Sequence, residues 1–325
     1  MRVLDTVTTL QGETLPIHAL TIGCADLGAP TLALTGGVHG LERIGSQVVV
    51  AFLRSLLQEL CWNEGLRARF RTLRVVAVPL VNPGGYLART RANPRGVDLM
   101  RNAPVDADRT SRFGLVGGHR LSPRLPWYRG VQGAPMEREA QAVTAWIESE
   151  VFASECALLV DCHSGFGFRD RLWYPYARTQ SPFPRAREAL ALARLLTETF
   201  PQHGYVIEPQ SASYTTHGDL LDHLFDRHTA RPGAGLFLPW TLEMGSWRWL
   251  ARRPWHALSP LAWFNPTDAL EHAGVLRQHL LLFRFLLDAL VSWPEAFQSC
   301  LGAWPEKIAR PTQAALRDLE SDARP

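Results

Sequence analysis

Lysine is almost absent from this chain. Lys307 is the only lysine, so the 34 lysine and arginine residues are nearly all arginine, and the formal net charge is only +3. No run of basic residues occurs, and no basic stripe is interleaved with aromatic side chains in the way that marks a nucleic-acid surface. The composition therefore argues against nucleic-acid binding, and we expect no nucleic-acid partner.

Cysteine is also scarce. The five cysteines are odd in number and widely spaced, which is typical of reduced thiols in a cytosolic protein rather than of a disulfide framework. The N-terminus has no long apolar stretch, so we expect no signal peptide. The apolar run 280–283 is interrupted by Arg284 and is too short to cross a bilayer. These features predict a cytoplasmic protein with no membrane partner.

The remaining composition is that of an ordinary globular domain. Hydrophobic residues make up 46% of the chain and charged residues 20%, and 325 residues suit one large domain. Residues after Pro305 are polar. We therefore predict one domain over residues 1–300 and a polar C-terminal tail over residues 301–325.

Apolar runs alternate with helical patterns along the chain. Strands are expected near residues 17–22, 31–34, 75–81, 157–160, 205–207 and 237–242. Helices are expected near 44–60 and 137–150, from about 181 to 200 with Pro184 in the first turn, and after the start signal at 265–268 to about 291. This order predicts an α/β fold with a mixed, largely parallel central sheet and helices on both faces.

The first chemically informative motif follows the run 31–34. That run reads as a buried strand, stops at two glycines, and is followed by His39 and Glu42 where the chain turns into a helix. Side chains at i and i+3 lie on the same side of a helical turn, so this imidazole and this carboxylate can reach one point. A pair of this kind is half of a hydrolytic zinc site, although HxxE alone also occurs by chance.

Two further strand ends carry polar residues of the same kind. The run 158–160 leads into His163 and the run 237–242 closes on Glu243. Alone, His163 is a candidate structural histidine and Glu243 a candidate surface carboxylate. Together with His39 and Glu42 they predict a site at the carboxyl ends of the strands. Cys162, beside His163, should point to the other face of its strand and pack in the core.

Five segments in order resemble the zinc metallocarboxypeptidases of the carboxypeptidase A type. Their wider group includes the aspartoacylase and succinylglutamate desuccinylase enzymes. The segments are HGLE at 39–42, NPGGY at 82–86, GVDLMRN at 96–102, DCHS at 161–164 and TLE at 241–243. The resemblance covers about residues 1–290. It implies a hydrolytic metallopeptidase whose catalytic domain fills residues 1–300.

The resemblance also assigns residue roles. It implies one zinc ion per chain, held by His39, Glu42 and His163, with an open position for water. Glu243 would act as general base and pass the proton of water to the leaving amine. Asp98 would orient His39 from outside the ligand set.

Arginines would complete the site. By motif position Arg91 is the candidate that stabilises the oxyanion, with Arg89 as the alternative. Arg101 would bind the terminal carboxylate of the substrate through two parallel hydrogen bonds. Met100, however, occupies the position of the family's asparagine, and a thioether donates no hydrogen bond. Tyr214 resembles the family's mobile tyrosine.

Three functions therefore remain open on the sequence. The first is a zinc carboxypeptidase that removes a C-terminal residue from a peptide. The second is an aspartoacylase-type zinc amidohydrolase acting on a small N-acyl amino acid, which the loss of the asparagine at Met100 keeps open. The third is a non-catalytic zinc-binding recognition module, against which the presence of Glu243 argues.

Overall fold

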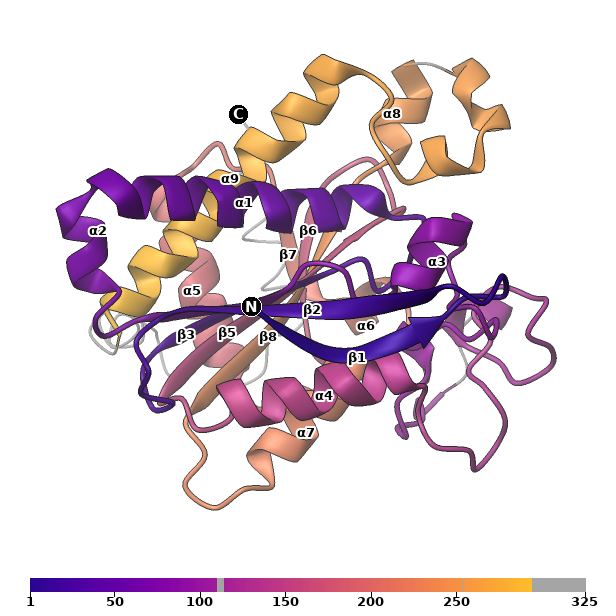
Figure 1. Cartoon of the computed structure of the whole chain (residues 1–325), viewed down its shortest axis with the longest axis horizontal. Coiled ribbons are helices and arrows are strands. Elements are labelled where there is room, and N and C mark those ends of the chain that lie inside the picture. Colours follow the sequence, from indigo (N-terminus) through magenta and orange to yellow (C-terminus); the bar gives the residue numbers. More distant parts are fainter. Residues whose placement is uncertain (110–113, 253, 294–325) are drawn as a thin grey trace.

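Among the residues that the structure describes, a mixed sheet of eight strands forms the centre of the molecule (Figure 1). The computed structural model describes residues 1–109, 114–252 and 254–293. The strand order in this part is β1-β2-β4-β3-β5-β8-β6-β7. The bounds are β1 Arg2–Thr8, β2 Thr14–Gly23, β3 Thr31–Gly36, β4 Arg74–Val78, β5 Cys156–Ser164, β6 Arg171–Tyr174, β7 Val206–Pro209 and β8 Leu236–Met244.

Four neighbouring strands in the middle of the sheet, β4, β3, β5 and β8, run parallel. Every residue of these four strands is buried, which is why they read in the sequence as continuous apolar runs. The outer pairs β1/β2, β2/β4 and β6/β8 are antiparallel. The predicted fold class, a mixed and largely parallel sheet, is confirmed.

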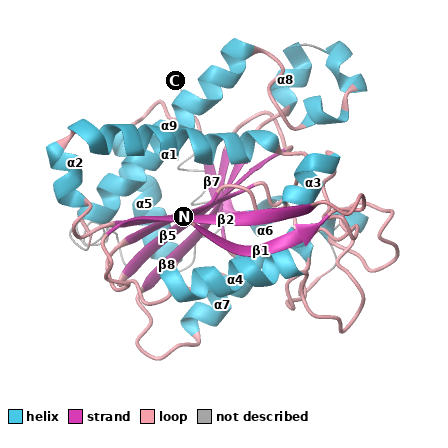
Figure 2. Ribbon diagram, in the orientation of Figure 1, coloured by secondary structure: helices cyan, strands magenta, loops and turns pink. Residues whose placement is uncertain are grey.

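Helices cover both faces of the sheet (Figure 2). α1 and α9 contact β3 and β5 on one face, and α4 and α7 lie together on the other. The helical bounds are α1 Arg43–Trp62, α2 Glu64–Arg69, α3 Pro83–Ala88, α4 Arg138–Val151, α5 Ala186–Thr199, α6 Gln210–Ser213, α7 Leu220–Thr229, α8 Trp247–Arg252 and α9 Ala269–Val291, with 3₁₀ turns η1 Leu99–Arg101, η2 Gly114–Gly117, η3 Pro254–Leu258 and η4 Pro260–Trp263.

The long predicted helices are present, with one boundary corrected. The side chain of Asp268 accepts hydrogen bonds from the backbone N–H groups of Leu270 (2.8 Å) and Glu271 (3.2 Å), so α9 starts where the sequence signal placed it. Pro184 was predicted inside the first turn of a helix, but α5 begins at Ala186 and Pro184 lies just before it.

α1 is the helix whose apolar length could be mistaken for a membrane span. By length and composition it is long and apolar enough to cross a bilayer. It lies against β3, β5 and α9, and Ile44, Val48, Phe52 and Leu56 are buried. This packing is that of a core helix in a globular domain.

The segment 82–132 is largely irregular, and in its described part its helical elements are only α3, η1 and η2. Asn82 caps α3 by accepting a hydrogen bond from the backbone N–H of Gly85 (2.8 Å). Asn102 links this segment to its surroundings by donating to Arg129 O (2.9 Å) and accepting from Glu137 N (2.6 Å). The predicted tail, residues 301–325, lies outside the described residues, as does the domain boundary at 300.

Candidate metal centre

The candidate metal ligands follow or end parallel strands and lie at one edge of the sheet. β3 ends at Gly36, and the turn after it carries His39 and then Glu42, directly before α1. His163 is the penultimate residue of β5, and Glu243 stands opposite it on β8 in parallel register. Because β3, β5 and β8 are neighbours in the sheet, their carboxyl ends lie side by side, where sites in open α/β sheets form.

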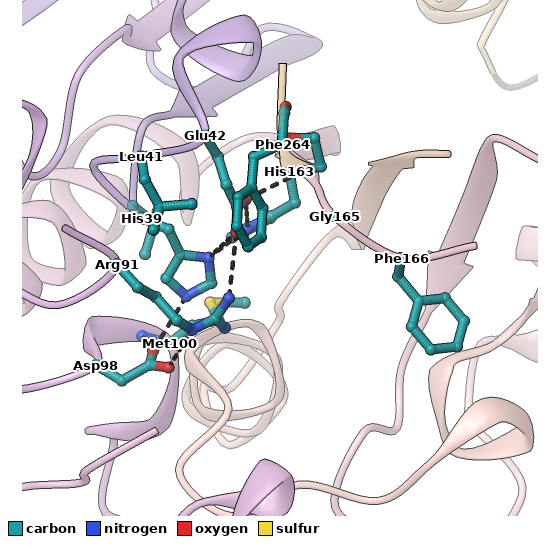
Figure 3. A network of polar contacts seen from close by, with 12 residues as sticks. His39, Leu41, Glu42, Arg91, Asp98, Met100, His163, Gly165, Phe166 and Phe264 are labelled. Atoms are coloured by element: carbon teal, nitrogen blue, oxygen red, sulfur yellow. Dashed lines mark hydrogen bonds and ion pairs between the residues drawn. The ribbon is translucent and has the colours of Figure 1, made fainter. Parts of the chain in front are cut away.

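The side chains of His39, Glu42 and His163 converge (Figure 3). Nδ1 of His39 lies 2.8 Å from Oε1 of Glu42. Nδ1 of His163 lies 3.1 Å from Oε2 of Glu42 and 3.1 Å from Nδ1 of His39. All three side chains are buried, and their candidate ligand atoms lie within 4.8 Å of one another. The structure therefore brings together the three residues proposed as metal ligands.

A carboxylate holds the outer nitrogen of each imidazole. Nε2 of His39 lies 3.0 Å from Oδ1 of Asp98, and Nε2 of His163 lies 2.6 Å from Oδ2 of Asp161. Asp98 contacts His39 as expected, whereas Asp161 was missed in the sequence analysis. Asp161 precedes His163 by two residues on β5, and this spacing, which puts both side chains on one face of a strand, is the signal that identifies it.

The imidazole contacts fit a metal ion. A carboxylate at Nε2 favours the tautomer that carries hydrogen there, which leaves the Nδ1 lone pairs of His39 and His163 facing each other at 3.1 Å. Two lone pairs repel at this distance unless a proton or a cation lies between them. Zinc accepts two histidines and one glutamate, and two nitrogens around a tetrahedral zinc lie roughly 3.3 Å apart. Both the donor set and the spacing suit zinc.

The electrostatics of the cluster favour positive charge. Burial opposes ionisation of Glu42, but His39 and His163 outweigh burial and hold the pKa of Glu42 well below its ordinary value. Burial opposes protonation of His163, but Asp161 and Glu42 raise its pKa well above the ordinary value. The cluster is therefore arranged to hold a cation between these side chains.

Glu243 lies next to this cluster with a different partner. Its Oε1 accepts a hydrogen bond from the backbone N–H of Phe166 (2.9 Å). Burial, followed by the charge of Glu42, raises the pKa of Glu243 to about 8. A cation at the cluster would lower this pKa and favour the carboxylate near neutral pH. A buried carboxylate of adjustable pKa suits the task of a general base.

Of the two candidate oxyanion-stabilising arginines, only Arg91 is joined to the cluster by the described contacts. Its Nε donates to Oδ2 of Asp98 (2.8 Å) and its Nη1 donates to Oε1 of Glu42 (3.2 Å). The Arg91 side chain remains 19% exposed. Arg89 is exposed and ends α3 in a left-handed conformation with φ of 59°. The geometry therefore favours Arg91 over Arg89.

Arg101 is a buried cation at the end of η1. It is 2% exposed, and its guanidinium donates to the backbone carbonyl oxygens of Met100 (3.2 Å) and Val116 (3.4 Å). Among the described residues no carboxylate forms an ion pair with it. Met100 is buried beside it, and its backbone N–H donates to Oδ1 of Asp98 (3.0 Å). The structure thus leaves Arg101 with unused capacity for an anionic group.

Tyr214 and His217 lie on the loop after α6. The Tyr214 ring contacts Phe166 with ring centroids 5.6 Å apart. Burial raises the pKa of the Tyr214 hydroxyl. The charge of Arg101 opposes this shift, and the charge of Glu243 adds to it. His217, on the same loop, accepts a hydrogen bond at Nδ1 from the backbone N–H of Ala107 (3.1 Å). Tyr214 therefore belongs to the surroundings of the site, and His217 holds the neighbouring loop.

The His–Glu–His cluster at the parallel strand ends of this α/β sheet forms a candidate metal centre. The sequence profile of the zinc carboxypeptidase family matches residues 1–245. This chain therefore belongs to the zinc carboxypeptidase family, as its motifs indicated.

Individual relatives are distant. Carboxypeptidase Z of Mus musculus is 27% identical over 151 residues, which cover 42% of this chain and 23% of that protein. Carboxypeptidase Z of Homo sapiens is 27% identical over 156 residues, with the same coverage. The match thus spans about a quarter of the length of these curated relatives.

Solved structures share the fold at low identity. The carboxypeptidase A of Helicoverpa armigera superimposes with a TM-score of 0.64 at 16% identity, covering 90% of this chain and 70% of the other. Thrombin-activatable fibrinolysis inhibitor gives a TM-score of 0.62 at 16% identity, covering 89% and 69%. These likenesses establish the zinc carboxypeptidase fold.

Proposed function

We propose that this protein is a zinc-dependent carboxypeptidase that removes the C-terminal residue of a peptide. In this proposal His39, Glu42 and His163 hold one zinc ion per chain. The observation that carries the exopeptidase assignment is Arg101, a buried guanidinium in the surroundings of the site without an ion-pair partner among the described residues. A buried cation of this kind is costly unless an anion pairs with it, and the free carboxylate of a peptide is a matching anion.

In this proposal the residues of the site have separate roles in amide hydrolysis. When bound, zinc supplies a Lewis acid that polarises a carbonyl group and makes water a stronger nucleophile at neutral pH. The carboxylate of Glu243, fixed by the Phe166 N–H, accepts the proton that water loses and gives it to the leaving amine. The guanidinium of Arg91, held by Asp98, stabilises the negative charge that develops on the carbonyl oxygen.

A second candidate is hydrolysis of a small N-acyl amino acid. Met100 favours it, because this buried thioether replaces the amide that would share the carboxylate with Arg101. A non-catalytic zinc-binding module is the third candidate. All three predict zinc binding, so they must be separated by substrate.

A matched substrate panel separates these functions. We expect hydrolysis of N-blocked dipeptides with a free C-terminus and little hydrolysis of N-acetyl or N-succinyl amino acids. A chelator should abolish this activity and added zinc should restore it. Activity only on the N-acyl amino acids would establish the second function, and one equivalent of zinc without hydrolysis of either class would establish the third.

The carboxylate anchor has its own prediction. Arg101→Ala should raise KM for free-acid substrates by about tenfold to a hundredfold, because a charge-assisted hydrogen bond pair is lost. Met100→Asn should lower KM for the same acids, since it restores an amide donor. Steady-state kinetics on matched acids and C-terminal amides measures both effects. Arg120→Ala is the control, because Arg120 donates to the backbone oxygens of Gly130 (2.8 Å) and Val131 (3.1 Å) in an outer loop.

Hydrolysis of the matched C-terminal amides tests whether Arg101 binds the substrate carboxylate. Neither variant should change the already poor hydrolysis of amides, because these lack the carboxylate. If wild-type protein cleaves amides as well as acids and neither variant alters that ratio, Arg101 is not an anchor and the exopeptidase assignment fails.

A further inference from the structure

The helix α1 begins at the candidate metal ligand Glu42 without a cap from its own segment. Glu42 is the N-cap residue, but among the described residues its side chain makes no capping hydrogen bond. Both of its carboxylate oxygens face the cluster, Oε1 toward His39 and Oε2 toward His163. A carboxylate that serves as a metal ligand cannot also accept the free N–H groups of the first helical turn. These groups therefore need another acceptor.

Asn265 supplies this acceptor from a distant part of the chain. Its Oδ1 accepts a hydrogen bond from the backbone N–H of Ile44 (2.9 Å), which is 221 positions away in the sequence. Its Nδ2 donates to the backbone oxygens of Leu41 (2.8 Å) and Leu261 (2.8 Å). Turning the amide over would break all three bonds, so its orientation is fixed. One side chain thus holds the backbone on both sides of Glu42.

The preceding residue, Phe264, holds the segment that carries a second candidate ligand. Its carbonyl oxygen accepts a hydrogen bond from Oγ of Ser164 (2.7 Å), and the backbone N–H of Ser164 donates to Oε2 of Glu42 (3.0 Å). Ser164 directly follows His163 and is buried. In Figure 3 Phe264 lies beside Glu42 and His163. Two consecutive residues, Phe264 and Asn265, therefore contact the segments of two of the three candidate ligands.

Phe264 also packs closely against the residue after Ser164. Gly165 has φ of 129°, and a Cβ atom built there would lie 2.6 Å from Cε1 of the Phe264 ring. Only glycine leaves room for this approach. The three hydrogen bonds of Asn265 use no side-chain atom of a candidate ligand. Phe264 and Asn265 can therefore hold the ligand-bearing segments in place before a metal ion enters.

Resting on the proposed zinc-dependent function, we infer that Asn265 is a positioning residue for the metal centre. Asn265 fixes the backbone around Glu42, and Phe264 fixes the backbone next to His163, so the ligands keep their spacing without metal. Zinc binding then requires less ordering of the chain than it would with free loops. Loss of the Asn265 amide should therefore weaken zinc binding, although Asn265 is not itself a ligand.

Zinc affinity measured without substrate tests this inference. Competition with a chromogenic zinc chelator gives the Kd for zinc of the wild type and of Asn265→Ala. The Kd of Asn265→Ala should be about tenfold to a hundredfold higher, the range typical of groups that orient metal ligands. At saturating zinc the variant should still bind one equivalent, because all three ligands remain. Its KM for free-acid substrates should then change by less than about twofold, because Arg101 is untouched.

Asn63→Ala is the matched control. Asn63 caps α2 by accepting a hydrogen bond from the backbone N–H of Leu66 (3.0 Å), and it donates to Oε1 of Glu59 (2.8 Å). This variant also removes a helix cap and an amide donor, but at the end of α1 opposite Glu42. It should lower the Tm of the zinc-free protein and leave the Kd for zinc within about twofold of the wild-type value.

Ser164→Ala gives a second measurement in case Asn265→Ala does not fold. It removes the hydroxyl that contacts Phe264 and should raise the Kd for zinc by a smaller factor. Unchanged zinc affinity in Asn265→Ala, or in Ser164→Ala where the first variant does not fold, would overturn the inference and leave the proposed function standing. The inference is also wrong if Asn63→Ala weakens zinc binding as much as Asn265→Ala. If the wild type itself binds no zinc, the proposed function fails.

Discussion

Replacing His163 with alanine is expected to lower bound zinc from one equivalent per chain to a small fraction, and amide hydrolysis should disappear with it. His163 supplies one of two imidazole nitrogens, and Nδ1 of His39 and Oε2 of Glu42 both lie within 3.1 Å of its Nδ1. Two protein ligands bind zinc far more weakly than the three found in hydrolytic sites. Metal analysis after dialysis measures the loss, and far-UV circular dichroism checks that the fold remains.

A second histidine variant makes this result specific. His217→Ala removes a partly exposed imidazole whose described polar contacts are with Ala107 and Asp106 rather than with the cluster. It should retain one equivalent of zinc. A folded His163→Ala protein that still carries a full equivalent would show that His163 is not a ligand, and the cluster would need another assignment.

The sheet could be predicted from the sequence wherever both of its faces are covered. β3, β5 and β8 are buried at every position, so burial itself produces the apolar runs from which they were predicted. β1 and β6 were missed for opposite reasons. β1 is an edge strand with mostly exposed or half-buried residues, and β6 is only four residues long. Neither leaves a run that stands out from a loop.

The site could be predicted where its residues fall at strand ends or in short motifs. His39, Glu42, His163 and Glu243 follow apolar runs, so parallel strands must bring them to one edge. Packing between distant segments could not be predicted in this way. The rings of Phe166 and Phe168 contact Trp247, and neither stretch contains a pattern that requires the other. The choice of Arg91 over Arg89 likewise depended on the left-handed turn at the end of α3.

Glu243→Gln should separate catalysis from metal binding. Glutamine has nearly the same size and can still accept the hydrogen bond from the Phe166 N–H, but its amide cannot accept a proton from water. We expect kcat to fall by about a hundredfold or more, because general-base catalysis typically contributes ~10²–10⁴. Zinc should stay at one equivalent, since Glu243 is not among the three clustered ligands.

The control for this prediction is Glu208→Gln. Glu208 is a partly buried carboxylate on β7 that accepts hydrogen bonds from Trp173 Nε1 (3.0 Å) and Ser213 Oγ (3.0 Å) rather than from Phe166. The kcat of Glu208→Gln should remain close to that of the wild type.

Because only the carboxylate form of Glu243 accepts a proton, wild-type kcat/KM should also rise with pH as Glu243 ionises, and this rise should be absent in Glu243→Gln. Near-wild-type turnover in Glu243→Gln would place the general base elsewhere, and the mechanism would then have to draw its base from another carboxylate of the site.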